Sequence, residues 1–261
     1  EDRPLPPLLR ARDRLRLGPL RAVVGRALGH PRLVELRFVG SADAIWAGLA
    51  RHGRPIQFAH VQQRLALWDV WSQIAASPVA FEPASASFAL DWHMLGRLRE
   101  RGVGFATLTH AAGLSSTGDA ELDSRLPFDE PYHLPQNTVA AIAKARCGGG
   151  RVVALGTTVT RALEHAAARP GGLVPGFGLA DQRLGQSSRL RVVDALVSGV
   201  HESGTSHHAL LGAFVPSDRL AAIDAELSVL GYRSHEFGES VLIEASAGPL
   251  ARLGTRLTGQ P

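Results

Sequence analysis

From about residue 79 to residue 245, predicted strands and helices alternate along the chain, and this alternation constrains the fold more than any other feature. Short apolar runs, typical of buried strands, alternate with longer segments of helical periodicity. Strands joined through helices lie parallel in one sheet, with the helices on its faces. The sequence therefore predicts an α/β fold with a mainly parallel sheet and flanking helices. The expected strands are 79–81, 103–108, 151–155, 189–197 and 240–245, and the expected helices are 91–101, 138–147, 159–168, 206–214 and 217–229.

The first 54 residues follow a different pattern. Residues 1–20 are rich in Pro, Arg and Leu without a period, so we expect an irregular segment. Residues 32–39 alternate apolar and polar side chains, as a half-buried strand does, and Ser41 is a suitable N-cap for a helix at 44–51. We therefore predict two domains, an N-terminal segment 1–54 with a partial β-rich subdomain and an α/β domain at 55–261.

The composition excludes several classes of protein. With 45% hydrophobic and 20% charged residues among 261, the chain is not intrinsically disordered. No apolar run reaches the roughly 18 residues that span a bilayer, so we expect no membrane partner. A single cysteine, Cys147, excludes a disulfide scaffold and a cysteine-based zinc cluster, and it favours a cytoplasmic location.

The basic residues are almost all arginine. Of 28 Lys and Arg residues only Lys144 is a lysine, yet the formal net charge is only +4. Arginine binds phosphate and carboxylate groups bidentately, so the composition permits a nucleic-acid partner. A genomic preference for arginine codons explains the same composition without any such partner.

The strongest local motif is the segment 149–164, GGRVVALGTTVTRALE. A buried strand runs into Gly156, and Thr157 and Thr158 then open a helix that carries Arg161 one turn later. Glycine lets the backbone turn tightly or approach a ligand, and the amides at a helix start bind anions. The alternative is that one threonine merely caps the helix and that Arg161 is solvated.

A second motif lies at 194–208, where a predicted strand ends in a polar loop that leads to a helix near Ser206. Open α/β sheets bind ligands at the carboxyl ends of their strands. His201 and His207 lack helical i,i+4 spacing and no carboxylate pattern completes a site, so we expect no metal. His207 and His208 are adjacent and point in different directions on a helix, so at least one of them is structural.

Two further segments offer acid–base groups. His110 follows a predicted strand and precedes the loop containing Ser115 and Ser116, and Glu130 lies in a short acidic and aromatic segment. The alternatives are a structural histidine and a solvated loop. No phosphate-binding P-loop, dinucleotide-binding glycine triplet or nucleophile elbow is present.

Taken in order, these segments resemble the S-adenosylmethionine:tRNA ribosyltransferase-isomerase family of queuosine biosynthesis. The family's stretch GGRVIAVGTTVVRALE is matched nearly residue for residue at 149–164. Its stretch Asp-x-Leu-Thr-Asn-Phe-His-x-Pro-x-Ser-Thr resembles 194–206, and its stretch Tyr-Arg-Phe-Phe-Ser-Tyr-Gly-Asp resembles 232–239. These stretches retain Asp194, Leu196, His201, Thr205, Ser206, Tyr232, Arg233, Gly238 and an acid at Glu239.

Three further matches retain one residue each. Glu130 is retained from Met-His-Ser-Glu, His110 from His-Val-Gly-x-Gly-Thr, and Pro83 from Ala-Pro-Thr-Ala-Gly. The family's N-terminal Asn-Asp-Thr-Arg region has no clear counterpart, so the chain is identified as a diverged member that is shortened or lacks this region. Residues 21–39 would then be the remnant of the small β-barrel domain of the family.

The resemblance implies that the ribosyl carbons of S-adenosylmethionine are transferred to a modified tRNA base. A base removes a hydrogen from C5′ beside the sulfonium, adenine and methionine leave, and an amine of the tRNA base captures the sugar. The implied catalytic residues are His110, Glu130 and His201. The implied substrate-binding residues are Pro83, Ser115, Ser116, Gly156, Thr157, Thr158, Arg161, Asp194, Thr205, Ser206, Tyr232 and Glu239.

Departures from the family leave alternatives open. Pro127, Phe128 and Asp129 replace Met-His-Ser, and Gly199 replaces an asparagine. A diverged paralogue acting on the same or a related nucleoside with a small-molecule acceptor, or by simple elimination, fits these changes, as does a non-catalytic nucleoside- or RNA-binding module. A tRNA acceptor predicts a contiguous arginine-rich face and salt-dependent binding, whereas a small acceptor predicts dispersed arginines and a closed pocket. The oligomeric state does not follow from the sequence.

Overall fold

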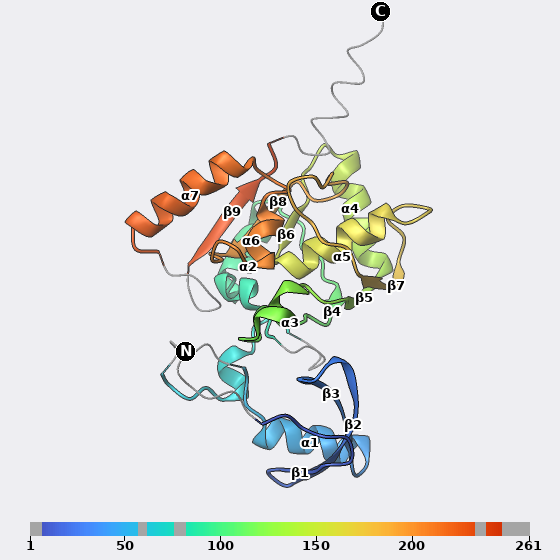
Figure 1. Ribbon diagram of the computed structural model, residues 1–261. Coiled ribbons are helices and arrows are strands. Elements are labelled where there is room, and N and C mark those ends of the chain that lie inside the picture. The colour runs from blue at the N-terminus through green and yellow to red at the C-terminus, as the bar shows by residue number, and fades with distance from the viewer. Residues whose placement is uncertain (1–6, 57–61, 76–81, 233–238, 247–261) are drawn as a thin grey trace, which may run out of the picture. The chain divides into compact units, whose positions relative to one another are not determined.

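The computed structural model describes residues 7–56, 62–75, 82–232 and 239–246 (Figure 1). The chain divides into two units, residues 1–71 and 72–261. The division between units lies after Trp71, so the domain boundary expected at 54/55 falls inside the first unit. Each unit is described here by itself.

The first unit contains a three-stranded antiparallel sheet in the order β1 (Arg14–Leu17), β2 (Leu20–His30) and β3 (Leu33–Phe38). The helix α1 (Ala42–His52) follows, and the Ser41 hydroxyl accepts a hydrogen bond from the Ala44 amide at 3.3 Å. The strand expected at 32–39 and the helix expected at 44–51 are confirmed. The irregular segment expected at 1–20 is wrong from residue 14 onward, because residues 14–17 pair with 20–23 across a turn at Gly18, while residues 7–13 form no helix or strand and residues 1–6 lie outside the described residues.

The second unit contains two more three-stranded sheets. One has the order β4 (Thr109–His110), β5 (Glu130–Leu134) and β7 (Gly176–Ala180), and the other has the order β6 (Val153–Leu155), β8 (Ala195–Gly199) and β9 (Ser240–Glu244). Strands β6 and β8 are parallel, and every other pairing between the described strands is antiparallel. The fold is therefore mixed α/β with small sheets and flanking helices. The prediction of a mainly parallel sheet is wrong.

The reason for this correction lies in strands that the pattern did not reveal. Strands β5 and β7 carry Pro131, Gly176 and Gly178, which lower strand propensity, so the sequence pattern predicts no strand in either segment. Their pairing with each other supplies the antiparallel contacts. The strand expected at 103–108 is wrong, since these residues form no strand and β4 follows them at Thr109–His110, and the one expected at 79–81 lies outside the described residues.

The helices expected at 91–101, 138–147, 159–168, 206–214 and 217–229 form to within a few residues, whereas a short helix at 120–124 and two 3-10 helices have no counterpart among the expected elements. Their bounds are α2 (Trp92–Glu100), α3 (Ala120–Ser124), α4 (Gln136–Cys147), α5 (Thr157–Ala168), α6 (Ser206–Leu211) and α7 (Ser217–Val229), with the 3-10 helices η1 (Leu67–Val70) and η2 (Ser85–Ala89). Figure 1 shows α5 in the interior of the second unit, between the parts of the chain that form β5 and β8. Eight of its twelve residues are buried, so α5 is the centre of the core. None of the described helices has the length and apolarity that crossing a membrane requires.

Candidate functional site

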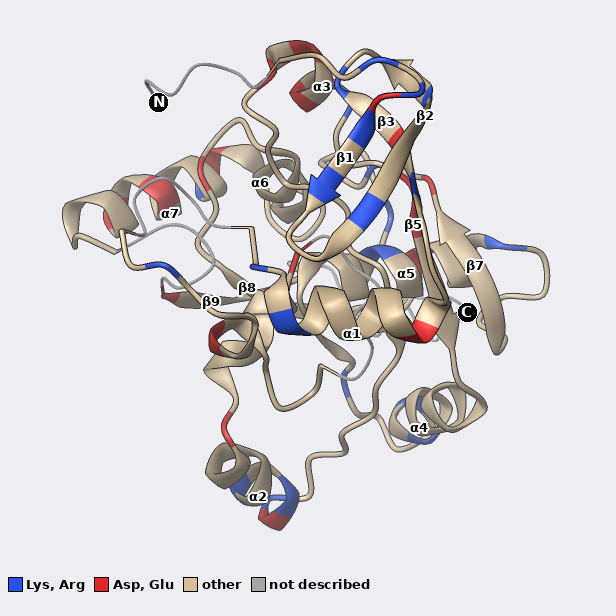
Figure 2. Ribbon diagram, turned by 90° about the horizontal axis from the view of Figure 1, so that it is seen from below, with Lys and Arg blue, Asp and Glu red and all other residues tan. Residues whose placement is uncertain are grey.

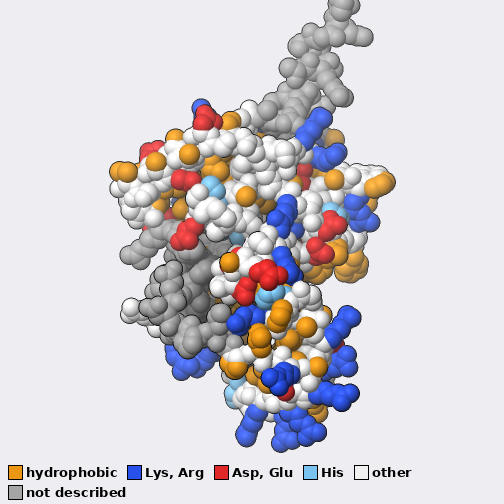
Figure 3. Space-filling model, viewed as in Figure 1, with side chains coloured by type: hydrophobic (Ala, Val, Ile, Leu, Met, Phe, Trp, Pro, Cys, Tyr) orange, Lys and Arg blue, Asp and Glu red, His pale blue; other side chains and the backbone are white. Residues whose placement is uncertain are grey.

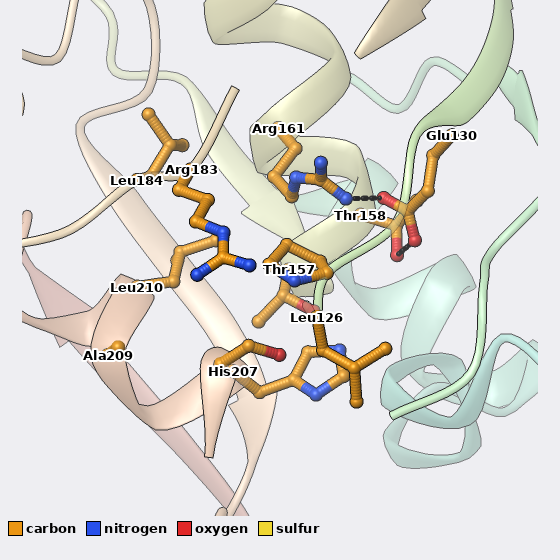
Figure 4. Close-up of a pocket in the computed structure, with 12 residues that line it drawn as sticks. Leu126, Glu130, Thr157, Thr158, Arg161, Arg183, Leu184, His207, Ala209 and Leu210 are labelled. Atoms are coloured by element: carbon orange, nitrogen blue, oxygen red, sulfur yellow. Dashed lines mark hydrogen bonds and ion pairs between the residues drawn. The ribbon is translucent and has the colours of Figure 1, made fainter. Parts of the chain in front are cut away.

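A cavity of about 90 Å³ lies at the start of helix α5 in the second unit (Figure 4). Strands β6 and β8 run parallel, and α5 begins directly after the carboxyl end of β6. The cavity is thus at the strand ends where α/β sheets bind ligands. It is lined by Leu126, Pro127, Glu130, Thr157, Thr158, Arg161, Arg183, Leu184, Ser206, His207, Ala209 and Leu210.

The turn into α5 depends on Gly156. Its backbone has φ 100° and ψ 150°, a conformation that side chains with a Cβ rarely adopt, while its amide still donates to the Val197 carbonyl at 2.8 Å. No side chain caps the helix, and Thr160 makes the first helical hydrogen bond, to the Gly156 carbonyl. The amides that precede Thr160 are therefore available to an anionic or hydroxyl group of a ligand.

The carboxylate of Glu130 is fixed from several sides. Its Oε2 accepts a hydrogen bond from Arg161 Nη1 at 2.6 Å, and both side chains are almost fully buried. Its Oε1 accepts from the Gly113 amide at 3.0 Å and from the Thr158 hydroxyl at 3.4 Å. Figure 4 shows the Glu130–Arg161 pair beside Thr158 at the edge of the cavity. This arrangement holds a carboxylate in one orientation at the helix start.

The N–H donors of Arg161 bond other groups of the protein and are not left for a ligand. Besides Glu130, its guanidinium donates to the carbonyls of Phe128, Ala180 and Gln182 at 2.9–3.2 Å. These bonds use all five N–H groups of the side chain. Arg161 therefore ties the beginning of β5 to the end of β7, and it positions Glu130 instead of serving as a free anion ligand.

A histidine pair borders the cavity on the α6 side. The ring of His207, which lines the cavity, stacks on the ring of His201 with centroids 4.9 Å apart and an interplanar angle of 19°. His201 Nε2 is 2.9 Å from the hydroxyl of Ser198, which is fully buried at the end of β8. Burial is the main cause that lowers the pKa of His207 to about 4, and the positive charge of Arg161 is the second cause. The imidazole is therefore neutral at pH 7.

The structure distinguishes the two adjacent histidines of α6. His208 Nε2 lies 2.7 Å from Asp224 Oδ2 on α7, so this side chain links two helices. His207 faces the cavity instead, next to Ser206, whose buried hydroxyl has no hydrogen-bond partner among the described residues. Thr205 caps α6 by accepting from the His208 amide at 3.2 Å.

His110 lies on β4 and does not line the cavity. Its buried Nδ1 has no hydrogen-bond partner in the described part of the chain, and burial lowers the pKa of His110 to about 4. Strand β4 is held by its pairing with β5, where His110 lies opposite Tyr132. His110 is therefore a neutral, unsatisfied side chain one strand away from Glu130.

A second carboxylate, Glu82, lies near Glu130. Glu82 Oε1 accepts from the amide and the hydroxyl of Ser115, at 2.6 and 2.8 Å. Burial raises the pKa of the Glu82 carboxyl and the Glu130 charge adds to this, against the opposing effect of the Ser115 hydrogen bonds. The loop 113–115 therefore contacts both carboxylates, through Gly113 and Ser115.

The remaining predicted site residues lie elsewhere. Asp194 is at the start of β8, where its Oδ2 accepts from the Val152 amide at 2.8 Å and pairs with Arg146 at 2.9 Å. Ser116 bonds Asp123 at 3.3 Å, and Tyr232 is 46% exposed. The cavity thus brings together five of the predicted residues and leaves ten outside its lining. Those outside are Pro83, His110, Ser115, Ser116, Gly156, Asp194, His201, Thr205, Tyr232 and Glu239.

Three residues at or near the cavity were not predicted as site residues from the sequence: Glu82, Arg183 and His207. In Figure 4 the Arg183 guanidinium points toward Thr157, and the His207 ring lies below Leu126. Only His207 had a sequence signal, because it belongs to the same polar motif, 194–208, as His201. Arg183 follows β7, a strand that was itself unpredicted.

Comparisons with known proteins identify the family of this chain. A family model described as queuosine biosynthesis protein matches residues 9–243. The S-adenosylmethionine:tRNA ribosyltransferase-isomerase of Pelobacter propionicus is 38% identical over 174 residues, covering 65% of this chain and 50% of the relative. The protein of the same name from Acaryochloris marina is 34% identical over 188 residues, covering 70% of this chain and 51% of the relative.

A solved structure is also similar. The crystal structure of an S-adenosylmethionine tRNA ribosyltransferase from Thermotoga maritima superposes with a TM-score of 0.52 at 28% sequence identity. The superposition covers 60% of this chain and 51% of that chain. The chain spans about half the length of the curated relatives it matches.

Proposed function

Because this chain belongs to the queuosine biosynthesis protein family, we propose that it carries out the reaction for which its relatives are named. That reaction is ribosyl transfer from S-adenosylmethionine, with isomerisation, to a modified tRNA base. The observation that supports this most strongly is the position of the cavity. Apart from Arg183, its polar lining comes from the segments 149–164 and 194–208 and from Glu130, which are the segments that resemble the family.

The start of α5 supplies an anchor for a polar part of the substrate. The uncapped amides and the hydroxyls of Thr157 and Thr158 suit the methionine carboxylate or a ribose hydroxyl. The unpartnered Ser206 hydroxyl lies on the opposite element, α6, and a ligand oxygen would satisfy it. A buried polar atom without a partner is costly, which favours a ligand at this position.

Two side chains at the cavity, His207 and Glu130, suit the chemistry at C5′ and at the sulfonium. His207 is neutral at pH 7, the form in which an imidazole is able to accept a proton, and the stacked His201 fixes the plane of its ring, so we assign to His207 the removal of the C5′ hydrogen. The fixed carboxylate of Glu130 places negative charge where a sulfonium cation would bind. His110 is a further candidate from the sequence, and its unpartnered nitrogen supports a role as a donor to departing adenine.

The volume of the cavity limits which part of the substrate this region holds. Sites for whole small-molecule ligands have volumes of roughly 300–1,000 Å³, whereas this cavity has about 90 Å³. We assign to it the atoms around the ribose and sulfonium, where the bonds change. The N-terminal sheet β1–β3 is proposed to derive from the small β-barrel domain of the family, and the cytoplasm is the proposed location.

The test is to incubate the purified protein with S-adenosylmethionine, with and without bulk tRNA, and to measure adenine and methionine by chromatography. Release of both only when tRNA is present is the expected result. Release without tRNA would indicate a small acceptor or simple elimination. Absence of both release and nucleoside binding would contradict the proposed function.

A matched pair of variants connects this activity to the cavity. Thr158→Val removes the hydroxyl that lines the cavity and bonds Glu130, and we expect turnover to fall by about tenfold or more. Thr160→Val makes the same change two residues later, where the hydroxyl bonds only the Gly156 carbonyl inside the helix. Equal turnover in the two variants would place the chemistry elsewhere.

A further inference from the structure

The two faces of the N-terminal sheet differ in chemistry. The register pairs Leu17 with Leu20 and Ala22 with Phe38, so these side chains share one face with the buried Val24. Helix α1 covers part of this apolar face, since a Cβ at Gly48 would lie 2.6 Å from the Leu20 side chain.

The opposite face is lined by arginines. Arg16 lies directly opposite Arg21, and Val23 lies between Arg14 on β1 and Arg37 on β3. All four arginines are exposed, and Figure 2 shows basic residues along β1 and β2. Figure 3 shows basic side chains projecting from the part of the surface that the N-terminal unit forms. We call Arg14, Arg16, Arg21 and Arg37 the arginine face.

The positive charge of the arginine face is only partly neutralised within the chain. Glu35 bonds Arg37 at 2.8 Å, and the Arg37 guanidinium lowers the pKa of this carboxyl, so the pair is ionised at neutral pH. Arg14 and Arg21 have no ion pair in the described part of the chain, and Arg16 bonds only the Gly18 carbonyl at 3.4 Å. Three arginines thus present free positive charge on one surface.

The stability of the fold does not explain this arrangement of arginines. Like charges directly opposite on neighbouring strands destabilise a sheet, as Arg16 and Arg21 do here. On a surface whose only requirement is solubility, charges of both signs are usually interspersed. Genomic preference for arginine does not account for the uneven distribution either. Residues 1–71 contain twelve arginines and six acidic residues, a formal charge of +6, whereas residues 72–261 contain sixteen Lys and Arg and eighteen acidic residues, a charge of −2.

We propose that the arginine face binds the phosphate backbone of RNA, and this rests on the proposed function, in which the acceptor is a tRNA. Guanidinium groups bind phosphate oxygens bidentately and remain charged at every physiological pH. A row of arginines about one strand spacing apart matches a polyanion better than a single small anion. The face therefore contributes affinity for the RNA without reading its sequence.

The test compares two triple variants with the same change in charge. Arg14→Gln, Arg16→Gln and Arg21→Gln together remove the free charges of the arginine face. Arg97→Gln, Arg99→Gln and Arg101→Gln together remove three exposed arginines at the end of α2. Binding of bulk tRNA is measured by fluorescence anisotropy at 50–200 mM KCl, and S-adenosylmethionine binding is measured by calorimetry.

The arginine-face variant is expected to bind tRNA on the order of tenfold more weakly, with the slope of log affinity against log salt shallower by about 2. Its S-adenosylmethionine binding and its melting temperature should not fall, because the variant also relieves like-charge repulsion. Equal tRNA affinity in the arginine-face variant and the wild type, or an equal loss in both variants, would overturn the inference. If tRNA-dependent adenine release persists in that case, the proposed function stands without it.

Discussion

Strand β8 has two ends that differ in how their polar groups are satisfied. At its start, Asp194 accepts from the Val152 amide and pairs with Arg146, and nearby Glu164 of α5 accepts from the amides of residues 191, 192 and 193 at 2.6–2.9 Å. At its other end, beside the cavity, the Ser206 hydroxyl has no hydrogen-bond partner, and the start of α5 has no side-chain cap, among the residues that the structure describes. We call these the closed end and the open end.

We propose that this difference separates the polar groups that stabilise the fold from those that bind a ligand. At the closed end the donors and acceptors come from the chain itself, so the polar groups stabilise the fold. At the open end some remain unused, which is costly unless a ligand supplies the partner. Asp194 and Glu130 have similar burial, at 5% exposure each. Burial alone therefore does not tell which carboxylate takes part in chemistry.

The largest expected effect is at the closed end. Glu164→Ala leaves three backbone amides near residue 192 without an acceptor, and each unsatisfied buried donor costs roughly 1–3 kcal/mol. We expect the free energy of unfolding to fall by about 3 kcal/mol or more in urea denaturation. Glu226→Ala, on the exposed side of α7, is the control and should change it by less than about 0.5 kcal/mol. Similar losses in the two variants would remove the distinction between these carboxylates.

The next effect is on activity at the open end. Glu130→Gln removes the negative charge while retaining the size and an acceptor oxygen, and we expect tRNA-dependent adenine release to fall by about 100-fold or more. The variant also leaves the Arg161 charge unpaired, so turnover is measured per folded molecule at a temperature well below its melting transition. Retention of wild-type turnover in this variant would exclude Glu130 from the reaction.

A smaller effect, on stability only, is expected for Asp194→Asn. The amide side chain retains an acceptor for the Val152 amide but loses the ion pair with Arg146, so we expect a loss of about 1–2 kcal/mol in the free energy of unfolding. Adenine release per folded molecule should be unchanged. A fall in that turnover as large as that of Glu130→Gln would mean that the closed end also belongs to the site.

The smallest effect is a dependence of stability on pH. The pKa of His207 is about 4 in the folded protein against an ordinary value of 6.5, so the unfolded chain binds this proton first as the pH falls. The stabilisation is complete above pH 6.5 and is lost as the pH falls toward 4, by about 1 kcal/mol at pH 5.5. His207→Asn should therefore lose less stability than the wild type between pH 7.5 and 5.5. His93→Asn, which changes an exposed histidine of α2, should follow the wild type.

Local patterns in the sequence were sufficient for most of the helices and for the helix start at the candidate site. The helical periodicity and the caps Ser41 and Asp91 are local signals, and the corresponding helices form. The motif at 149–164 likewise gave the strand, the glycine turn and the helix start. Strands β5 and β7 gave no such signal, because each becomes a strand only through its pairing with the other.

The sequence by itself determined the family resemblance, the mixed strand and helix content and the position of Gly156, because these depend on residue order and local conformation. Only the tertiary structure decided the roles of Arg161, His207 and Asp194. In the tertiary structure Arg161 is buried and pairs with Glu130, and His207 lines the cavity. Asp194 lies at the closed end, where it accepts from the Val152 amide. The physical reason is that a side chain's role depends on its partners, which are often distant along the chain: Glu130 lies 31 residues from Arg161, and Arg146 lies 48 residues from Asp194.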